Sequence, residues 1–185
     1  ACGDVLEDVT YYADANDLKA YSNRANDLGV KTEGGVTYHS FGPNPNQSST
    51  TDLCITTKEN AVDNSGKYLV IKIRTNTTAD NWEAWFNMYV NGGQSTNRIK
   101  PQTSVIEGTG WTTIVVDLEK AGRTAVFTPD GEEYPDVQVV FSPYCASAFL
   151  DENSTVDIAY IAFCSSIDGV RNVVDQETVV YQEKT

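Results

Sequence analysis

The segment Trp82–Asn91, WEAWFNMYVN, alternates at every position between an apolar set and a polar or aromatic set. The apolar set is Ala84, Phe86, Met88 and Val90, and the other set is Glu83, Trp85, Asn87, Tyr89 and Asn91. A strand sends successive side chains to opposite faces, so this period of two predicts a strand with one buried face. The opposite face then presents a tryptophan and a tyrosine flanked by amides.

Similar alternation predicts further strands along the chain. Lys67–Thr75 (KYLVIKIRT) is the best candidate for a central strand, with Leu69, Ile71 and Ile73 on its core face and Lys72 and Arg74 on the other. Thr155–Phe163 (TVDIAYIAF) is apolar at nearly every position, which is typical of a strand covered on both sides. The remaining expected strands are Val9–Tyr12, Val36–Phe41, Leu53–Thr57, Trp111–Leu118, Val137–Ser142 and Thr178–Tyr181.

The segments between these strands complete the expected architecture. Asn and Asp residues between the first strand and Val30 favour an irregular crossing, and Gln94–Gln102 is predicted to be a loop. Ser166–Val174 is predicted to form a short helix. Because strands dominate and no strand–helix–strand rhythm occurs, the sequence predicts an all-β fold. We expect a two-sheet antiparallel β-sandwich of jelly-roll type with a short C-terminal helix, in one domain over residues 1–185.

Charge and hydropathy exclude some classes of partner. The formal net charge is −13, which argues against nucleic acid and anionic membranes because both select Lys and Arg. No apolar run approaches the 18 residues or more of a membrane span, and no charged-plus-apolar leader is present. We therefore expect a mature or excised domain without a membrane span.

Four cysteines, Cys2, Cys54, Cys145 and Cys164, are widely spaced and form no CxxC pair, which disfavours a zinc cluster. Two disulfides, Cys2–Cys54 and Cys145–Cys164, are one hypothesis. Buried free thiols that act as small hydrophobes are the other. A structural Ca²⁺ is a further hypothesis, because this cation takes oxygen ligands. Its candidate ligands are Asp4, Glu7, Asp8 and Asp157, although their spacing is not that of an EF-hand.

Three segments resemble a known family: KYLVIKIRT, WTTIVVDLEKA and STVDIAYIAFCSSIDGVRNVV, which together cover roughly Lys67 to Val174. They resemble the extracellular jelly-roll modules of gut and rumen Firmicutes, which are similar to carbohydrate-binding modules. The most specific piece is Asp157–Ser166 (DIAYIAFCSS). The resemblance implies a jelly roll that is secreted, extracellular or at the cell surface, with polysaccharide binding as the commonest role. It carries over no ligand residues.

Sugar binding needs aromatic rings that stack on C–H faces and polar groups that bond to hydroxyls. If Lys67–Thr75 and Trp82–Asn91 pair in one sheet, five outward residues share a face: Lys72, Arg74, Trp85, Asn87 and Tyr89. Gln138 joins them from the strand at 137–142. The alternative is that a loop or the terminal helix covers this face and that Trp85 anchors the cover.

A second hypothesis places the site at the loop ends of the sandwich. Trp82 and Trp111 lie at strand entries, where loops gather. Trp82 with Asn81, or Tyr38 with His39, would line a pocket there. The alternative is that such a tryptophan is a rim residue that packs under a loop.

Catalytic signals are weak. His39 is the only histidine, and a lone histidine on a predicted strand usually has a structural role. The motifs HExxH and GxSxG and a Gly-rich phosphate loop do not occur. Asp157 stands alone on its strand, whereas glycoside hydrolases of this fold need two carboxylates across the scissile bond. We therefore predict a module that is not an enzyme. It targets an attached extracellular enzyme or cell-surface protein to a plant or other polysaccharide. The alternative is an adhesion or spacer module that contacts protein and binds no glycan.

Overall fold

The computed structural model describes residues 6–20, 25–42, 55–57, 66–76, 110–120 and 155–174 with their side chains, and the backbone of 82–90, 93–99, 138–145 and 179–182. The elements are β1 (Val9–Asp14), η1 (Ala15–Asp17), β2 (Leu18–Ala20), β3 (Asn26–Glu33), β4 (Val36–Gly42), β5 (Ile55–Thr57), β6 (Tyr68–Thr75), β7 (Trp82–Val90), β8 (Gly93–Ile99), β9 (Thr112–Asp117), β10 (Gln138–Cys145), β11 (Val156–Cys164), α1 (Ile167–Val174) and β12 (Val179–Gln182).

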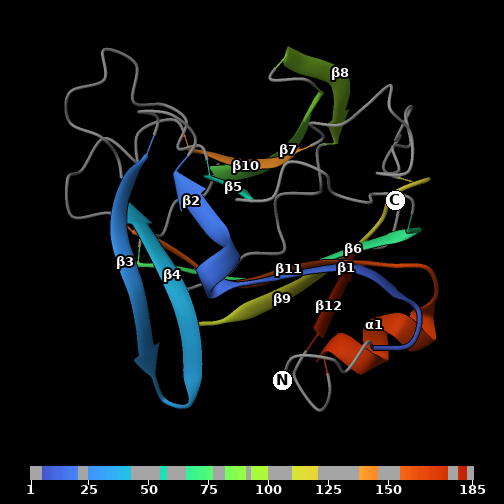
Figure 1. Cartoon of the computed structure of the whole chain (residues 1–185), viewed down its shortest axis with the longest axis horizontal. Helices are drawn as coiled ribbons and strands as arrows, with labels where there is room; N and C mark the ends of the chain where they lie inside the picture. The colour runs from blue at the N-terminus through green and yellow to red at the C-terminus, as the bar shows by residue number, and fades with distance from the viewer. Residues whose placement is uncertain are drawn as a thin grey trace.

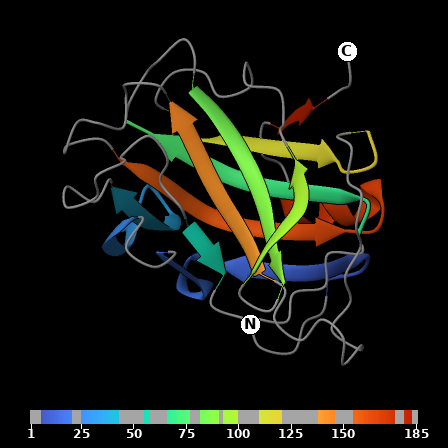
Figure 2. The same ribbon diagram turned by 90° about the horizontal axis from the view of Figure 1, so that it is seen from above.

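The strands form two sheets that pack face to face (Figure 1). The seven-stranded sheet has the order β12-β9-β6-β11-β4-β3, with β1 also paired to β11, and the five-stranded sheet has the order β2-β5-β10-β7-β8. In Figure 2, β7 and β10 cross over the strands of the larger sheet. The predicted two-sheet sandwich with a short C-terminal helix is confirmed. One described pairing, β12 with β9, is parallel, and the others are antiparallel.

β11 is the central strand, and all nine of its residues are buried, as its apolar sequence predicts. One edge pairs with β6 along its length. The other edge is shared, because β4 pairs with residues 156–158 and β1 with residues 160–164. A register shift at Ala159 separates the two halves. The sheet therefore forks at this bulge, and η1 follows β1 directly at the fork.

The main core lies between the sheets. Leu69, Ile71 and Ile73 of β6 pack there with Phe163 of β11 and Ile55 of the five-stranded sheet. A second apolar cluster lies on the outer face of the seven-stranded sheet, where α1 contributes Val170 and Val174. In Figure 1, α1 lies on the side of this sheet away from β7, β8 and β10, and the turn end of the β3–β4 hairpin extends to the same side.

The start of β1 holds α1 in place through polar contacts. Asp8 has a positive φ of 61°, and its carbonyl accepts a hydrogen bond from the Ser165 amide at 2.9 Å. Its carboxylate accepts from the Ser166 hydroxyl at 2.8 Å. The Asn172 side chain donates to the carbonyl of Glu7 at 2.8 Å. Among the described residues the helices include none that is long and apolar enough to cross a membrane.

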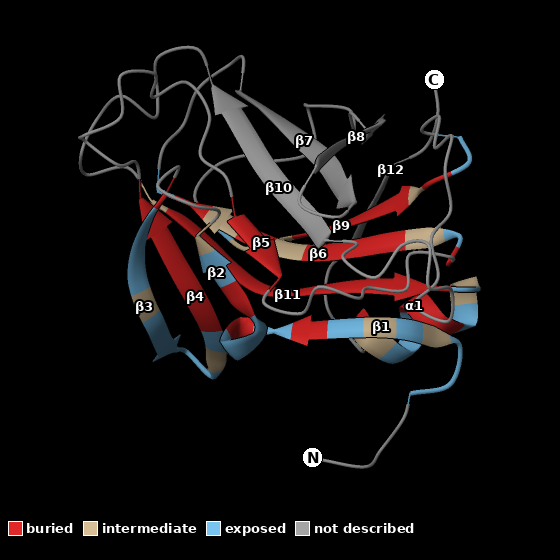
Figure 3. Ribbon diagram, turned by 45° about the horizontal axis from the view of Figure 1, so that its top comes forward, coloured by how far each residue is buried: buried red, intermediate tan, exposed pale blue. Residues whose placement is uncertain are grey.

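Several sequence-based expectations are wrong in detail. The region expected to be an irregular crossing contains β2 and β3, and the region expected to be a loop contains β8. β3 and β8 were missed for the same reason: both are edge strands, which need no alternating apolar face. β3 is exposed at nearly every position, as its pale blue colour in Figure 3 shows.

The predicted Cys145–Cys164 disulfide is also wrong, because Cys164 is a free, buried thiol. Cys164 belongs to the outer-face cluster of the seven-stranded sheet, whereas Cys145 lies on β10 of the other sheet. The Cys2–Cys54 pair lies outside the described residues.

Candidate functional site

The predicted binding face is divided between the two sheets. β6, which carries Lys72 and Arg74, pairs with β9 and β11, whereas β7 pairs with β8 and β10. The expected pairing of β6 with β7 is therefore wrong, because the chain crosses to the other sheet between them. Lys72 and Arg74 lie apart from the residues on β7 and β10, which are Trp82, Trp85, Asn87, Tyr89 and Gln138.

The backbone register of β7 agrees with the predicted division of its residues between two faces. Phe141 on β10 is opposite both Phe86 and Ile55, and Ile55 is buried in the core between the sheets. Directly opposed residues share a face, so positions 86 and 141 lie on the core face. Gln138 is opposite Tyr89, as expected for a neighbour in the same sheet. The side chains of β7 and β10 lie outside those described, so the Trp85–Tyr89 binding face stays a prediction.

The described cluster with the richest polar and aromatic chemistry surrounds Arg74 on the outer face of the seven-stranded sheet. The guanidinium carbon lies 4.7 Å from the ring centroid of Tyr38 and 4.6 Å from that of Trp111. The two rings are themselves 5.5 Å apart in an edge-to-face arrangement. Arg74 thus lies against two aromatic rings that also contact each other, one from β4 and one from the residue before β9. Such cation–π contacts fix its orientation.

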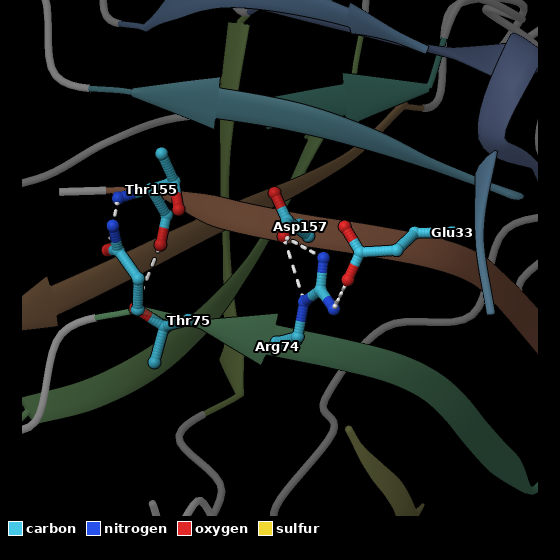
Figure 4. A network of polar contacts seen from close by, with 6 residues as sticks. Glu33, Arg74, Thr75, Thr155 and Asp157 are labelled. Atoms are coloured by element: carbon cyan, nitrogen blue, oxygen red, sulfur yellow. Dashed lines mark hydrogen bonds and ion pairs between the residues drawn. The ribbon is translucent and has the colours of Figure 1, made fainter. Parts of the chain in front are cut away.

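Two carboxylates complete the cluster (Figure 4). Arg74 donates from Nε and Nη2 to Asp157 Oδ2, at 3.0 and 2.9 Å, and its Nη1 lies 3.5 Å from Glu33 Oε1. We call Glu33, Tyr38, Arg74, Trp111 and Asp157 the Arg74 cluster. Two further hydrogen bonds beside it, from Thr75 Oγ1 to the Thr155 carbonyl and from the Thr155 amide to Asn76, tie β6 to the start of β11.

Burial makes this ion pair tight. The Asp157 side chain is 8% exposed and that of Arg74 20% exposed. Burial by itself lowers the pKa of Arg74, but the hydrogen bond and negative charge of Asp157, with a further contribution from Tyr38, raise it above its usual value. Asp157 Oδ1 is buried and has no hydrogen-bond partner in the described part of the chain. Asp157 therefore depends on Arg74 for its counter-charge.

Lys72, two residues before Arg74 on β6, lies on the same face. Its ammonium nitrogen is 5.8 Å from the centroid of the Trp111 ring. Beyond it, Tyr160 of β11 stacks on Tyr12 of β1, with ring centroids 5.6 Å apart and an interplanar angle of 23°. Tyr160 is buried, whereas Tyr12 is 45% exposed. Cations and aromatic rings thus follow one another across this face.

Two cavities open on the same face. One, of about 310 Å³, is lined by every member of the Arg74 cluster except Trp111, together with polar neighbours: Lys31, Glu33, Tyr38, Ser40, Arg74, Thr75, Asn76, Thr155 and Asp157. The other, of about 410 Å³, is lined at the sheet fork by Tyr12, Asp14, Ala15, Asn16, Gly35, Val36, Thr37, Lys72, Ala159 and Tyr160. Both fall in the size range of small-molecule sites.

The predicted loop-end pocket of Tyr38 with His39 does not form. Tyr38 belongs to the outer cluster, whereas His39 stacks on Phe41 of the main core, so the two side chains face opposite ways. His39 is buried and its Nδ1 donates to the Ala15 carbonyl at 2.8 Å, while Nε2 lies 2.7 Å from Asp27 Oδ1. These contacts give His39 a structural role that links η1 to β3. Asn81, the suggested neighbour of Trp82, lies outside the described residues.

The suggested calcium ligands are not brought together. Asp8 contacts Ser165 and Ser166 after the C-terminal end of β11, whereas Asp157 pairs with Arg74 near its N-terminal end. Within the described ranges, groups of three or more metal-ligating side chains are absent. Asp4 lies outside those ranges.

Sequence reasoning identified Lys72 and Arg74 as outward residues but missed their aromatic partners. The sequence shows only that Trp111 lies at the start of a predicted strand. The structure adds the register, in which Thr112 opposes Ile73. That register brings Trp111 beside Arg74. The stack of Tyr12 on Tyr160 needed knowledge that β1 pairs with the second half of β11.

The chain matches no protein-family model and no curated protein. Several solved structures that it is similar to are carbohydrate-binding modules. It is 15% identical to CBM86 from Roseburia intestinalis, a low-affinity xylan-binding module, at a TM-score of 0.41, covering 86% of this chain and 97% of that one. It is 11% identical to a family 30 carbohydrate-binding module at a TM-score of 0.44, and the similarity covers 84% of this chain and 83% of that one.

A third similar structure contains the CBM22-1 and GH10 modules of a Clostridium thermocellum xylanase complexed with xylohexaose, at 8% identity and a TM-score of 0.47. The similarity covers 84% of this chain and 28% of that chain, so this chain spans little more than a quarter of its length. At TM-scores below 0.5, none of these three likenesses identifies a ligand.

Proposed function

We propose that the chain is a non-catalytic carbohydrate-binding module whose site is the outer face of the seven-stranded sheet. The observation that carries the proposal is the cavity of about 310 Å³ at the Arg74 cluster. There one aromatic ring, that of Tyr38, lines an open space together with a guanidinium, two carboxylates, an amide and hydroxyl groups. This combination is what a sugar requires, with apolar C–H faces and directional hydroxyls on the same ring.

The contacts of Arg74 give this site rigidity before any ligand binds. Arg74 is held by two rings and by Asp157, so its remaining N–H donor positions are fixed in direction. A preorganised donor loses less conformational entropy on binding than a free arginine does. Tyr38 supplies an aromatic ring in the lining, and the half-buried Trp111 supports Arg74 from beside the cavity.

The arrangement of the carboxylates supports a role other than catalysis. Glu33 and Asp157 line the same cavity, but both lie against the guanidinium of Arg74. Glycoside hydrolysis by the two-carboxylate route needs one acid that holds a proton and one base, set across the scissile bond. Two acidic groups tied to one cation do not suit that division of roles.

The finer parts of the proposal follow from the sequence. A module without catalytic groups serves a protein that needs to stay near a polysaccharide. We therefore propose that the chain is secreted or at the cell surface and targets an attached enzyme or surface protein to that polysaccharide. The residues Trp85, Asn87 and Tyr89 of β7, with Gln138, are a second candidate face for the same function, and Trp82 at the start of β7 remains a candidate for a loop-end site.

Affinity electrophoresis against soluble xylan, mixed-linkage β-glucan, glucomannan and galactan tests the function. We expect at least one polysaccharide to retard the chain and the Trp111→Ala variant to lose that retardation, while Trp111→Phe keeps part of it. Trp85→Ala reports on the second face. Circular dichroism shows whether each variant is folded. Lys31→Ala changes an exposed residue of the same cavity and is expected to weaken the retardation without affecting the fold. No retardation by any polysaccharide would favour the adhesion or spacer role.

A further inference from the structure

The larger cavity, of about 410 Å³, lies at the fork where β1 and β4 share one edge of β11. The unpaired residue Ala159 forms part of its lining, and η1 borders it through Ala15 and Asn16. We call this space the fork cavity. Its lining includes no residue of the Arg74 cluster, so it is a separate space from the cavity there.

The fork cavity is the immediate neighbour of the cavity at the Arg74 cluster. β6 contributes Lys72 to the first and Arg74 to the second. β11 contributes residues 159 and 160 to the first and residue 157 to the second, and β4 contributes 36 and 37 to the first and 38 and 40 to the second. Residues two apart on a strand are on the same face and roughly 7 Å from each other. The two cavities therefore follow one another along the same three strands.

The lining of the fork cavity has the parts of a sugar site. Tyr12 is exposed and its ring is held in position by the stack on Tyr160, which gives a rigid aromatic wall. Lys72 supplies N–H donors, Asp14 supplies acceptors and Asn16 supplies both. The Asp14 carboxylate also accepts a hydrogen bond from the backbone N–H of Asn16 at 2.8 Å, so this part of the lining is ordered.

The charges of the two linings balance. Lys31 and Arg74 face Glu33 and Asp157 in one cavity, and Lys72 faces Asp14 in the other. An acidic sugar would meet no excess of cations in either cavity. In a chain of net charge −13, it would also be repelled at longer range.

We propose that the fork cavity is a second subsite of the glycan-binding face, so that the ligand is a linear, neutral oligosaccharide that spans both cavities. This inference rests on the proposed function and adds chain length and charge class to it. A disaccharide contacts one cavity only. A longer chain occupies the cavity at the Arg74 cluster and reaches Tyr12 at once, and so gains the contacts of both cavities.

Isothermal titration calorimetry with xylo-oligosaccharides and cello-oligosaccharides of two to six units tests this proposal. One series is expected to gain affinity steeply with length. The Tyr12→Ala variant is expected to weaken binding of the hexasaccharide by about tenfold, the loss of one aromatic contact, and to leave the disaccharide within about twofold. Tyr12→Phe keeps the ring and retains binding. Lys72→Ala weakens the hexasaccharide, whereas Lys120→Ala, an exposed lysine outside both cavities, does not.

Xylo-oligosaccharides that carry glucuronic acid are the acidic probe and are expected to bind no more tightly than the neutral ones. Unchanged hexasaccharide affinity in Tyr12→Ala, an affinity that does not rise with length, or tighter binding of the acidic probe overturns the proposal. The same holds if no oligosaccharide of either series binds. Retardation of a polysaccharide in affinity electrophoresis would then leave the proposed function standing while the fork subsite fails.

Discussion

Arg74 connects stability to function at the scale of single residues. Its guanidinium neutralises a carboxylate that is almost completely buried, and two aromatic rings hold it in place. Exposed ion pairs contribute little, but a buried charge that loses its partner is costly. We therefore expect an arginine-to-alanine substitution to lower stability more at Arg74 than at an exposed arginine of the same chain.

The Arg74→Ala variant is expected to lower the free energy of unfolding by about 2 to 3 kcal/mol, because Asp157 is left without a counter-charge. The value lies below that of fully buried pairs because Arg74 is 20% exposed. The matched control is Arg171→Ala, whose partner Asp168 and own side chain are 79% and 69% exposed. That change is expected to cost about 0.5 kcal/mol or less. Urea unfolding of the two variants compares them, and equal losses would contradict this account.

Cys164 gives a pH dependence with a defined sign. Burial, helped by the negative charge of Asp8, raises the pKa of its thiol from 9.0 to about 11. The unfolded chain ionises this thiol first, so its contribution to stability is complete below pH 9 and is lost as the pH rises towards 11. The loss is of the order of 2 kcal/mol.

Chemical unfolding in reducing buffer at pH 7 to 11 measures this effect against Cys164→Ala, which lacks the thiol but keeps the other titrating groups. The difference in unfolding free energy between wild type and variant is expected to shrink above pH 9. A difference that stays constant over the whole range would show that burial does not shift this thiol.

At the scale of elements, the docking of α1 on β1 depends on close approach at Gly169. A Cβ atom placed on Gly169 would meet the backbone oxygen of Asp8 at 2.3 Å. This carbonyl also accepts from Ser165, so it is not free to move away. The glycine is therefore required by packing, although glycine within a helix is intrinsically unfavourable.

The Gly169→Ala variant is expected to destabilise the chain by about 1 to 2 kcal/mol, since the clash outweighs the gain of about 1 kcal/mol in helix propensity. Gly110→Ala is the matched control, because a Cβ there meets no atom within 4 Å. Thermal unfolding followed by circular dichroism tests both. A Gly169→Ala variant that is more stable than wild type would contradict the described helix position.

The same scale explains how much of the fold the sequence could predict. β6 and β11 were predictable because burial imposes a pattern of apolar residues on each. In β6 apolar residues occupy the core face at alternate positions, and in β11 they occupy nearly every position. β3 and β8 were not, since edge strands can be polar throughout. Strand pairing was the weakest point. Consecutive strands β6 and β7 lie in different sheets, and alternation within a strand says nothing about its partner. For that reason the sequence could not show that Lys72 and Arg74 lie in a different sheet from Trp85 and Tyr89.

For the whole molecule, the sandwich presents two outer faces, one on each sheet. The described chemistry favours the outer face of the seven-stranded sheet, which carries both cavities and α1. The charge-balanced linings predict that binding depends little on ionic strength, although the chain as a whole is strongly acidic. Screening by salt weakens interactions between net charges and has little effect on stacking and neutral hydrogen bonds.

Titration of the polysaccharide that retards the chain most, at 50 and 500 mM NaCl, measures this dependence. The affinity is expected to change by about twofold or less. A loss of tenfold or more would show that an ionic contact dominates and that the ligand is charged.

The central claim is that glycan binds at the Arg74 cluster, where Trp111 lies against Arg74, and the three tryptophans of the chain make this directly measurable. Trp82 and Trp85 lie on β7 of the five-stranded sheet, and Trp111 precedes β9 of the other. Each gives one indole N–H signal in a ¹⁵N-correlated NMR spectrum, assigned by substituting each tryptophan in turn. During titration with the soluble polysaccharide that is bound, the Trp111 signal is expected to shift while those of Trp82 and Trp85 stay in place. Shifts confined to Trp82 and Trp85 would contradict the account.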